Sequence, residues 1–122
     1  MADAFADPDR IEGYHAHIYY NPATRAQAER LRQAIGECFS AKLGNWHDEA
    51  VGPHPVSMYQ VAFAAEAFPS LVPWLMLNRD GLDVLVHPLS GDSLADHTRY
   101  AMWLGQVLPL RLEVLRRASP TG

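Results

Sequence analysis

The sequence predicts a single α+β domain in which helices pack on one face of an antiparallel sheet. The chain has 122 residues, of which 48% are hydrophobic, and this is enough apolar material for one core. Apolar residues alternate in some segments, as in strands, and recur every three or four residues in others, as in helices. These segments follow one another in the order β-α-β-β-α-β.

The first half of the chain contains two predicted strands with a helix between them. Residues 14–20 alternate in the period-two manner of a strand. Thr24 stands three residues before Gln27, which is the spacing of a capping box, and the apolar residues that follow keep helical spacing until the helix ends near Gly44. Residues 45–51 indicate a weaker second strand.

The next part of the chain repeats the alternation of strand and helix. Residues 57–64, rich in aromatic and β-favouring side chains, indicate a third strand. A second helix begins at Phe68 and ends at Gly81. Residues 82–87 then form a short fourth strand, which Pro88 stops because proline lacks a backbone N–H.

The order of these elements is the ferredoxin-like arrangement, in which the first and fourth strands lie side by side. A C-terminal helix capped by Asp92 or Ser93 and running to Leu104 follows the fourth strand, and alternation over residues 108–115 allows a fifth strand. The helices of such a fold cover one face of the sheet and leave the other open. We therefore expect a homodimer in which a second copy covers the open face.

Composition limits the partners and the location of the chain. The net charge is −4 with both signs interspersed, so we expect no nucleic-acid partner. The longest apolar stretch, residues 68–77, is far shorter than the roughly 20 residues of a membrane span. Acidic residues in 1–12 indicate a flexible cytoplasmic leader, followed by a domain over 13–117 and a tail over 118–122. The single cysteine, Cys38, fits a reducing compartment and is predicted to be buried on the first helix.

Four of the six histidines lie on strands or in a turn, where a site on the open sheet face would be built. His15 and His17 point to the same face of the first strand, and His87 ends the neighbouring fourth strand, so their imidazoles converge in this fold. His54 lies in a turn between two prolines and is within reach of them. Neutral imidazole is a common ligand for catalytic transition metals. A polar sheet face is the alternative explanation of the His-x-His pair.

Several other residues of the sequence could complete a metal site. Iron oxygenases typically combine two histidines with one carboxylate. The carboxylates that could complete the site are Glu49, Glu66, Asp83 and Asp92, and histidines alone could also complete it. We expect His47 and His97 to be structural, with His97 hydrogen-bonded to the backbone of its helix.

Several separate motifs stand in order along nearly the whole chain. They are His15–Tyr20 (HAHIYY), Gly52–Pro55 (GPHP), Met58–Val61 (MYQV), Pro73–Arg79 (PWLMLNR), Val86–Pro88 (VHP) with Gly91-Asp92, and Asp96-His97 through Trp103–Gly105. In this combination the sequence resembles the DOPA 4,5-dioxygenase family. The resemblance implies a ferredoxin-like domain, an iron(II) site and extradiol cleavage of a catechol by O2, next to rather than between its two hydroxyls.

The motifs also match the family's histidine positions, which are His15, His17, His54 and His87. From this resemblance and the expected convergence we assign His15, His17 and His87 as ligands of Fe(II), His54 and Tyr59 as catalytic residues, and Tyr19 and Arg79 as substrate-binding residues. His54 would be the acid–base group, since a turn can place it beside the metal without ligation. The alternative for Arg79 is a cation at a helix end.

Two other classes of protein fit the same pattern. One is a non-catalytic module that binds an aromatic ligand or a metal without turnover. The other is a cofactor-free monooxygenase of the dimeric α+β-barrel type, which the number of histidines disfavours. Bound metal separates the dioxygenase from the monooxygenase, and turnover separates both from the binding module.

Overall fold

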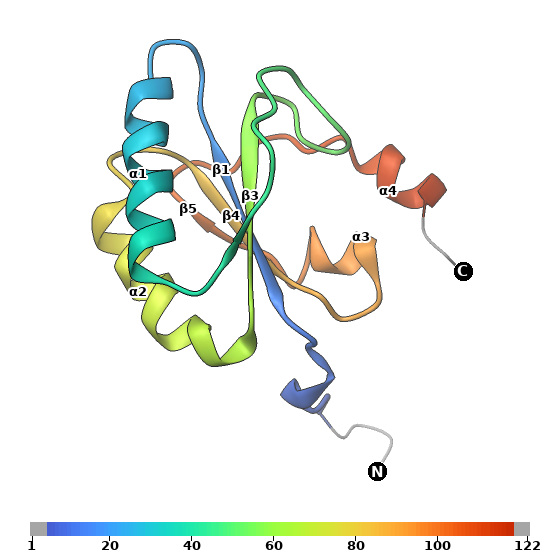
Figure 1. Cartoon of the computed structure of the whole chain (residues 1–122). Coiled ribbons are helices and arrows are strands. Elements are labelled where there is room, and N and C mark those ends of the chain that lie inside the picture. Colours follow the sequence, from blue (N-terminus) through green and yellow to red (C-terminus); the bar gives the residue numbers. More distant parts are fainter. Residues whose placement is uncertain (1–4, 119–122) are drawn as a thin grey trace.

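The computed structural model describes residues 5–118 and shows a five-stranded antiparallel sheet in the order β2-β3-β1-β4-β5 (Figure 1). The strands are β1 (Tyr14–Tyr19), β2 (Lys42–Leu43), β3 (Met58–Phe63), β4 (Val84–Pro88) and β5 (Met102–Leu104). The helices are α1 (Arg25–Cys38), α2 (Phe68–Asn78), α3 (Ser93–Asp96) and α4 (Leu112–Ala118), with short 3-10 turns η1 (Pro8–Arg10) and η2 (Ala65–Ala67). The predicted α+β, ferredoxin-like class is confirmed, and β1 and β4 are neighbours as expected.

The main core lies between the sheet and the two long helices, α1 and α2, which cover the same face (Figure 1). Ala28, Leu31 and Ile35 of α1 recur at helical spacing and are buried against the sheet. On the strands, alternate residues such as Ala16 and Ile18 point into this core, so the residues between them point to the opposite face. The prediction that Cys38 is buried is wrong, since this last residue of α1 is exposed.

The second strand is shorter and earlier than predicted. Pairing with β3 is limited to Lys42 and Leu43, and within 45–51 only an isolated bridge from His47 to Met58 continues it. The indole of Trp46 instead packs edge-on against aromatic rings of the core, with centroids 4.9 Å from Tyr59.

The predicted helix to Leu104 and the predicted strand within residues 108–115 are both wrong. The third helix ends at Asp96 after one turn, where the Thr98 hydroxyl bonds the backbone carbonyls of Leu94 and Ala95 and thus competes with the helix. The chain then supplies β5, which pairs with the free edge of β4. The fifth strand therefore lies at Met102–Leu104, and within residues 108–115 the chain forms the start of α4 instead.

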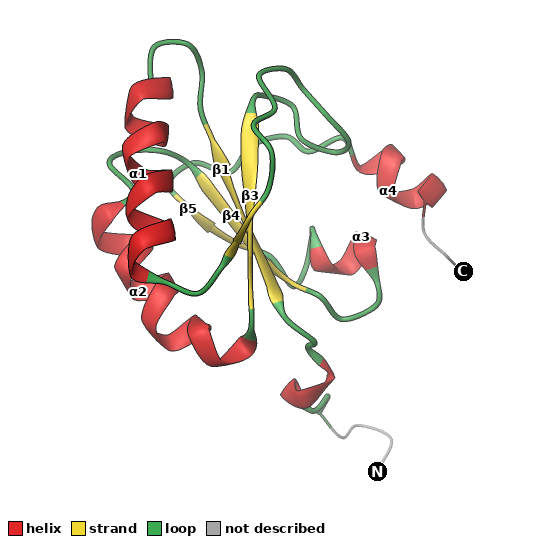
Figure 2. Cartoon of the chain, in the orientation of Figure 1, coloured by secondary structure: helices red, strands yellow, loops and turns green. Residues whose placement is uncertain are grey.

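The face opposite α1 and α2 is not open as predicted. Tyr19, Met58 and Leu85 form a second, smaller apolar cluster, against which Trp103 and Leu108 pack. Figure 2 shows α3 and α4 on this side of the sheet, across from the two long helices. An open face therefore no longer argues for a homodimer, which stays a prediction.

The segment before β1 continues the pairing of β1 with β4. Asp7 caps η1 with its side chain, and the N–H of Glu12 donates to the carbonyl of Leu89 at 3.0 Å. These contacts lie inside the predicted leader, whereas residues 1–4 and 119–122 lie outside the described residues. Within the described part of the chain, no helix is both long and apolar enough to cross a membrane.

Candidate metal centre

Five histidines gather on the sheet face that α3 and α4 cover. His15 and His17 come from β1, and His15 stands opposite His87 in the antiparallel register of β1 and β4. His54 enters from the turn after Gly52, and His97 follows directly after α3. The three strand histidines thus meet as predicted, because the ferredoxin-like order makes their two strands neighbours.

The rings of these histidines are in mutual contact. The Nε2 atoms of His17 and His87 lie 3.1 Å apart. Ring centroids are 4.1 Å apart for His17 and His54, and 4.0 Å apart for His87 and His97. His15 completes the set, with its centroid 5.2 Å from that of His87.

Two sets of three histidines have the spacing of metal ligands. In each set the donor nitrogens all lie within 4.8 Å of one another. The first histidine group is His15, His17 and His87, and the second histidine group is His17, His54 and His97. His17 belongs to both.

Backbone carbonyls fix the orientation of two rings. Nδ1 of His87 lies 2.9 Å from the carbonyl oxygen of Pro88, and Nδ1 of His97 lies 2.8 Å from that of Ser93. A carbonyl only accepts, so each Nδ1 carries the hydrogen and each neutral ring keeps its lone pair on Nε2. Metal-binding histidines characteristically donate their other N–H in this way.

The hydrogen between His17 and His87 can then be placed. Because Nε2 of His87 carries the lone pair, Nε2 of His17 donates to it, and the lone pair of His17 lies on Nδ1. That Nδ1 is buried and has no hydrogen-bond partner. An unpartnered buried nitrogen among neutral imidazoles is costly in an apolar interior but suits a transition-metal ion, so the residues present fit such an ion.

Burial also keeps the cluster uncharged. Burial, together with the neighbouring His97, lowers the pKa of His54 to about 4 and that of His87 to about 3. Burial lowers the pKa of His15 as well, and that of His17 most strongly, where His54 and His87 add to the effect. Each neutral imidazole keeps one nitrogen lone pair that can bind a metal ion, whereas a protonated ring keeps none.

Tyr19 lies at the cluster and contacts His54. Its hydroxyl is 2.7 Å from Nδ1 of His54, and its ring stacks on Trp103 with centroids 5.8 Å apart. Burial raises the pKa of Tyr19, so the phenol stays protonated. A hydroxyl both donates and accepts, so Tyr19 can satisfy Nδ1 of His54 in either tautomer.

Neither histidine group contains a carboxylate. Two of the four predicted candidates have structural partners instead: Asp83 accepts from the N–H of Gln106, and Asp92 caps α3. Asp96 is buried, but its carboxylate is occupied by the N–H and hydroxyl of Ser90. It acts on the cluster only at a distance, by opposing the lowering of the pKa of His15.

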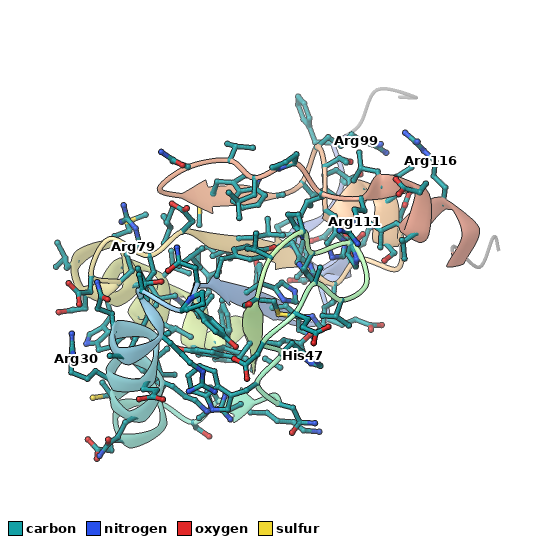
Figure 3. The ribbon with its side chains drawn as sticks, turned by 90° about the horizontal axis from the view of Figure 1, so that it is seen from above. Arg30, His47, Arg79, Arg99, Arg111 and Arg116 are labelled. Carbon is teal, nitrogen blue, oxygen red and sulfur yellow. The ribbon has the colours of Figure 1, made fainter. Side chains whose placement is uncertain are left out.

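The structure does not bring Tyr59 and Arg79 to the histidines. Tyr59 is buried in the main core on the opposite face, where its hydroxyl donates to the carbonyl of Ala28 at 2.9 Å. Arg79 follows α2, and its guanidinium donates to the carbonyl of Met76 at 3.3 Å. Figure 3 shows Arg79 on the helical side, away from the arginines near α3 and α4. This is the helix-end position that was the alternative for Arg79.

Sequence reasoning missed the place of His97. Its hydrogen bond to the backbone is confirmed, but its ring also lies in the cluster. A continuous helix would have aligned it with Leu94 and Ala101, and the helix instead ends one residue earlier. The Asp96-His97 motif was the available signal.

A cavity of about 510 Å³ lies at the end of β4, and His87 is the one member of the histidine cluster in its lining. Its lining includes His87 together with the apolar side chains of Ile11, Tyr14 and Phe68. Arg10, from the segment predicted as a leader, is an exposed member of the lining. The cavity has room for a small aromatic molecule.

The fold and the cluster together define a class of protein: a ferredoxin-like α+β domain with a buried all-histidine site suited to a transition metal. Comparison with protein families narrows this class. The model of the Dopa 4,5-dioxygenase family matches residues 14–114. The chain belongs to the Dopa 4,5-dioxygenase family.

Two proteins with similar sequences are consistent with membership of this family. The chain is 35% identical over 119 residues to an "Uncharacterized 21.2 kDa protein" of Botryotinia fuckeliana, covering 85% of this chain and 63% of the relative. It is 35% identical over 111 residues to the DOPA 4,5-dioxygenase of Amanita muscaria, covering 84% of this chain and 49% of that enzyme. The chain therefore spans less than two thirds of the length of these relatives.

A solved structure matches over almost all of the chain. The crystal structure of a "putative dioxygenase" from Nostoc punctiforme is 50% identical, with a TM-score of 0.93. The match covers 94% of this chain and 100% of the other. Nearly all of the domain described here is thus similar to that protein.

Proposed function

We propose that the protein is a non-haem iron(II) extradiol dioxygenase, which opens the ring of a catechol such as L-DOPA or a related dihydroxyphenyl compound with O2. The observation that carries the proposal is the buried cluster around His17 and His87, in a chain of the Dopa 4,5-dioxygenase family. Both atoms of O2 enter the ring-opened product, so the reaction needs no external reductant.

His15, His17 and His87 would hold the iron through one nitrogen each. Bound iron(II) would supply a common coordination sphere for the catechol oxygens and O2, which removes the entropic cost of a three-body encounter. The apolar residues around the cluster, including Leu85 and Trp103, exclude water from this face. Three neutral ligands would leave the full charge of the ion available to a catecholate.

His54 is the proposed acid–base residue. Its Nε2 would take a proton from a catechol hydroxyl and return it later in the reaction. The Tyr19 hydroxyl, 2.7 Å from Nδ1, holds the ring in place and can follow the change of tautomer. This contact supports a positioning role for Tyr19, and direct contact of Tyr19 with the substrate remains part of the proposal.

The cavity beside His87 is the proposed place for the organic part of the substrate. Its apolar wall suits an aromatic ring and its aliphatic substituent. Arg10 in the lining would pair with a substrate carboxylate, which is the role the sequence had suggested for Arg79. Catechols that carry a carboxylate are therefore the proposed substrates. A cytoplasmic location stays a prediction.

The test is anaerobic reconstitution with ferrous iron, followed by oxygen uptake and a visible spectrum with L-DOPA, caffeate and protocatechuate. We expect oxygen uptake, a yellow ring-opened product, and loss of both on chelation. Bound iron without oxygen uptake for any catechol would favour the binding module. Oxygen uptake that survives removal of the metal would favour the cofactor-free monooxygenase.

A further inference from the structure

The second histidine group has a use beyond acid–base chemistry. Its members, His17, His54 and His97, bring three nitrogens within 4.8 Å of one another, which is the same limit that the first group meets. The function proposed above uses only the first group to hold iron. The second group offers the same number of donors with the same chemistry.

His97 has the fixed ring of a metal ligand. Its Nδ1–H donates to the carbonyl of Ser93 at 2.8 Å, so its lone pair lies on Nε2. This repeats the arrangement of His87 with the carbonyl of Pro88 at 2.9 Å. Each histidine group therefore combines the shared His17 with one histidine whose ring a backbone carbonyl orients.

A second ring of this group is also oriented. Tyr19 lies 2.7 Å from Nδ1 of His54, and its hydroxyl can accept a hydrogen from that nitrogen. Nε2 of His54 is then free to bind a metal ion. In the second group, hydrogen bonds to Tyr19 and to the carbonyl of Ser93 thus orient His54 and His97.

Electrostatics limits how many ions the cluster can hold. The two groups share His17 and contain no carboxylate to offset a second dication nearby. Two dications this close in a buried site would repel each other strongly. One ion at a time is the arrangement that the charges allow.

We propose that His17, His54 and His97 form a second position for the metal ion, so that one ion occupies either of two positions that share His17. This inference rests on the proposed function, because the same cluster must bind a metal. It assigns His97 a role that the sequence did not indicate. It also predicts a redundancy among the outer histidines that a single three-ligand site would not have.

The test exploits His15 and His97, each of which belongs to one group only. Both are half-buried, so substitution disturbs the core less than at His17. We would compare His15→Ala, His97→Ala, the double variant and His17→Ala, with His47→Ala as a control outside both groups. Apo protein is loaded with Co(II), and bound cobalt per chain and its affinity are measured by competition with a chelator.

We expect each single variant to keep one cobalt ion with an affinity within about 10-fold of the unsubstituted protein, because the other position remains. The double variant and His17→Ala should bind at least about 100-fold more weakly, as loss of ligands requires. The visible spectra of the cobalt-loaded single variants should differ from each other, since their ligand sets differ. His47→Ala should match the unsubstituted protein.

Loss of cobalt from His15→Ala alone, with His97→Ala unchanged, would overturn the second position. Retention of cobalt by the double variant would overturn it as well. An alanine variant can lose its native circular dichroism because of the cavity it creates. In that case the comparison is repeated with His15→Phe and His97→Phe, which fill the volume of the lost ring. If the unsubstituted protein binds no metal, the proposed function itself fails, and this result differs from a loss confined to one variant.

Discussion

Nε2 of His17 and Nε2 of His87 lie 3.1 Å apart on two neighbouring strands. The carbonyl of Pro88 fixes the hydrogen of His87 on Nδ1, so a single hydrogen lies between the two rings. The contact holds both rings neutral inside the protein and leaves a lone pair of His17 without a partner. A buried nitrogen without a partner among neutral imidazoles fits a transition-metal ion.

Removal of His17 should abolish metal binding, because both histidine groups contain it. His17→Ala should weaken iron(II) binding at least about 100-fold, and turnover should be lost with the iron. The measurement is iron per chain after anaerobic loading and desalting, with His47→Ala as the matched control. Iron content and activity equal to the control would show that His17 is not a ligand.

Without metal, stability should fall as the pH falls from about 6.5 toward 4. Burial lowers the pKa of His54 to about 4 and that of His87 to about 3, whereas the unfolded chain has ordinary histidines. Above pH 6.5 both states are neutral at these rings, and below it the unfolded state binds protons that the folded state excludes. The expected loss is on the order of 2 kcal/mol per histidine at pH 5.

Urea unfolding of the apo protein at several pH values measures this effect. A His54→Phe variant is the control, since it should lose less stability over the same range. A free energy of unfolding that stays constant between pH 7 and pH 5 would mean that the cluster is not neutral and buried as described.

Changes at the Tyr19–His54 contact should affect turnover more than metal content. His54→Ala keeps the first histidine group and should retain iron, while turnover falls by about 100-fold or more through loss of the acid–base residue. Tyr19→Phe removes only the hydrogen bond at 2.7 Å and should cost about 10-fold. Iron per chain and kcat are measured on the same samples. Unchanged kcat in His54→Ala would exclude its catalytic role.

The two faces of the sheet should respond independently to substitution. Tyr59→Phe removes the hydrogen bond to the Ala28 carbonyl in the main core and should lower the free energy of unfolding by about 1 kcal/mol. Metal affinity should stay that of the unsubstituted protein, because Tyr59 lies on the face away from the histidines. Urea unfolding and iron loading test the two parts, and a loss of iron binding would place Tyr59 in the site after all.

The sequence predicted the sheet and its long helices because their patterns are strong and local. The alternation through His15 and His17 gave both β1 and the face of its histidines, and the order of elements placed β4 beside it. The meeting of His17 with His87, 70 positions apart, then followed from topology alone. The weaker elements differ from their prediction where side chains form contacts that periodicity does not indicate, as at Trp46 and Thr98.

The histidine cluster was predictable only where its residues lie on regular strands. Residues on regular strands have a known direction, so the first histidine group could be inferred from the pattern. His97 lies just after a helix that stops early, and no periodicity indicates where its ring points. Tyr59 and Arg79 were assigned to the site from the chemistry of their side chains. In the structure, Tyr59 points into the core beneath the helices, and Arg79 bonds to the end of α2.

The central claim is that the histidine cluster supports insertion of O2 into a catechol. The most direct measurement is mass spectrometry of the product formed from L-DOPA or caffeate under isotopically labelled O2, with iron-loaded protein and with His17→Ala. We predict a ring-opened product that contains both labelled oxygen atoms, formed only by the protein that holds iron. A ring-opened product without labelled oxygen in its new carboxylate, or equal product from the His17→Ala variant, would contradict this account.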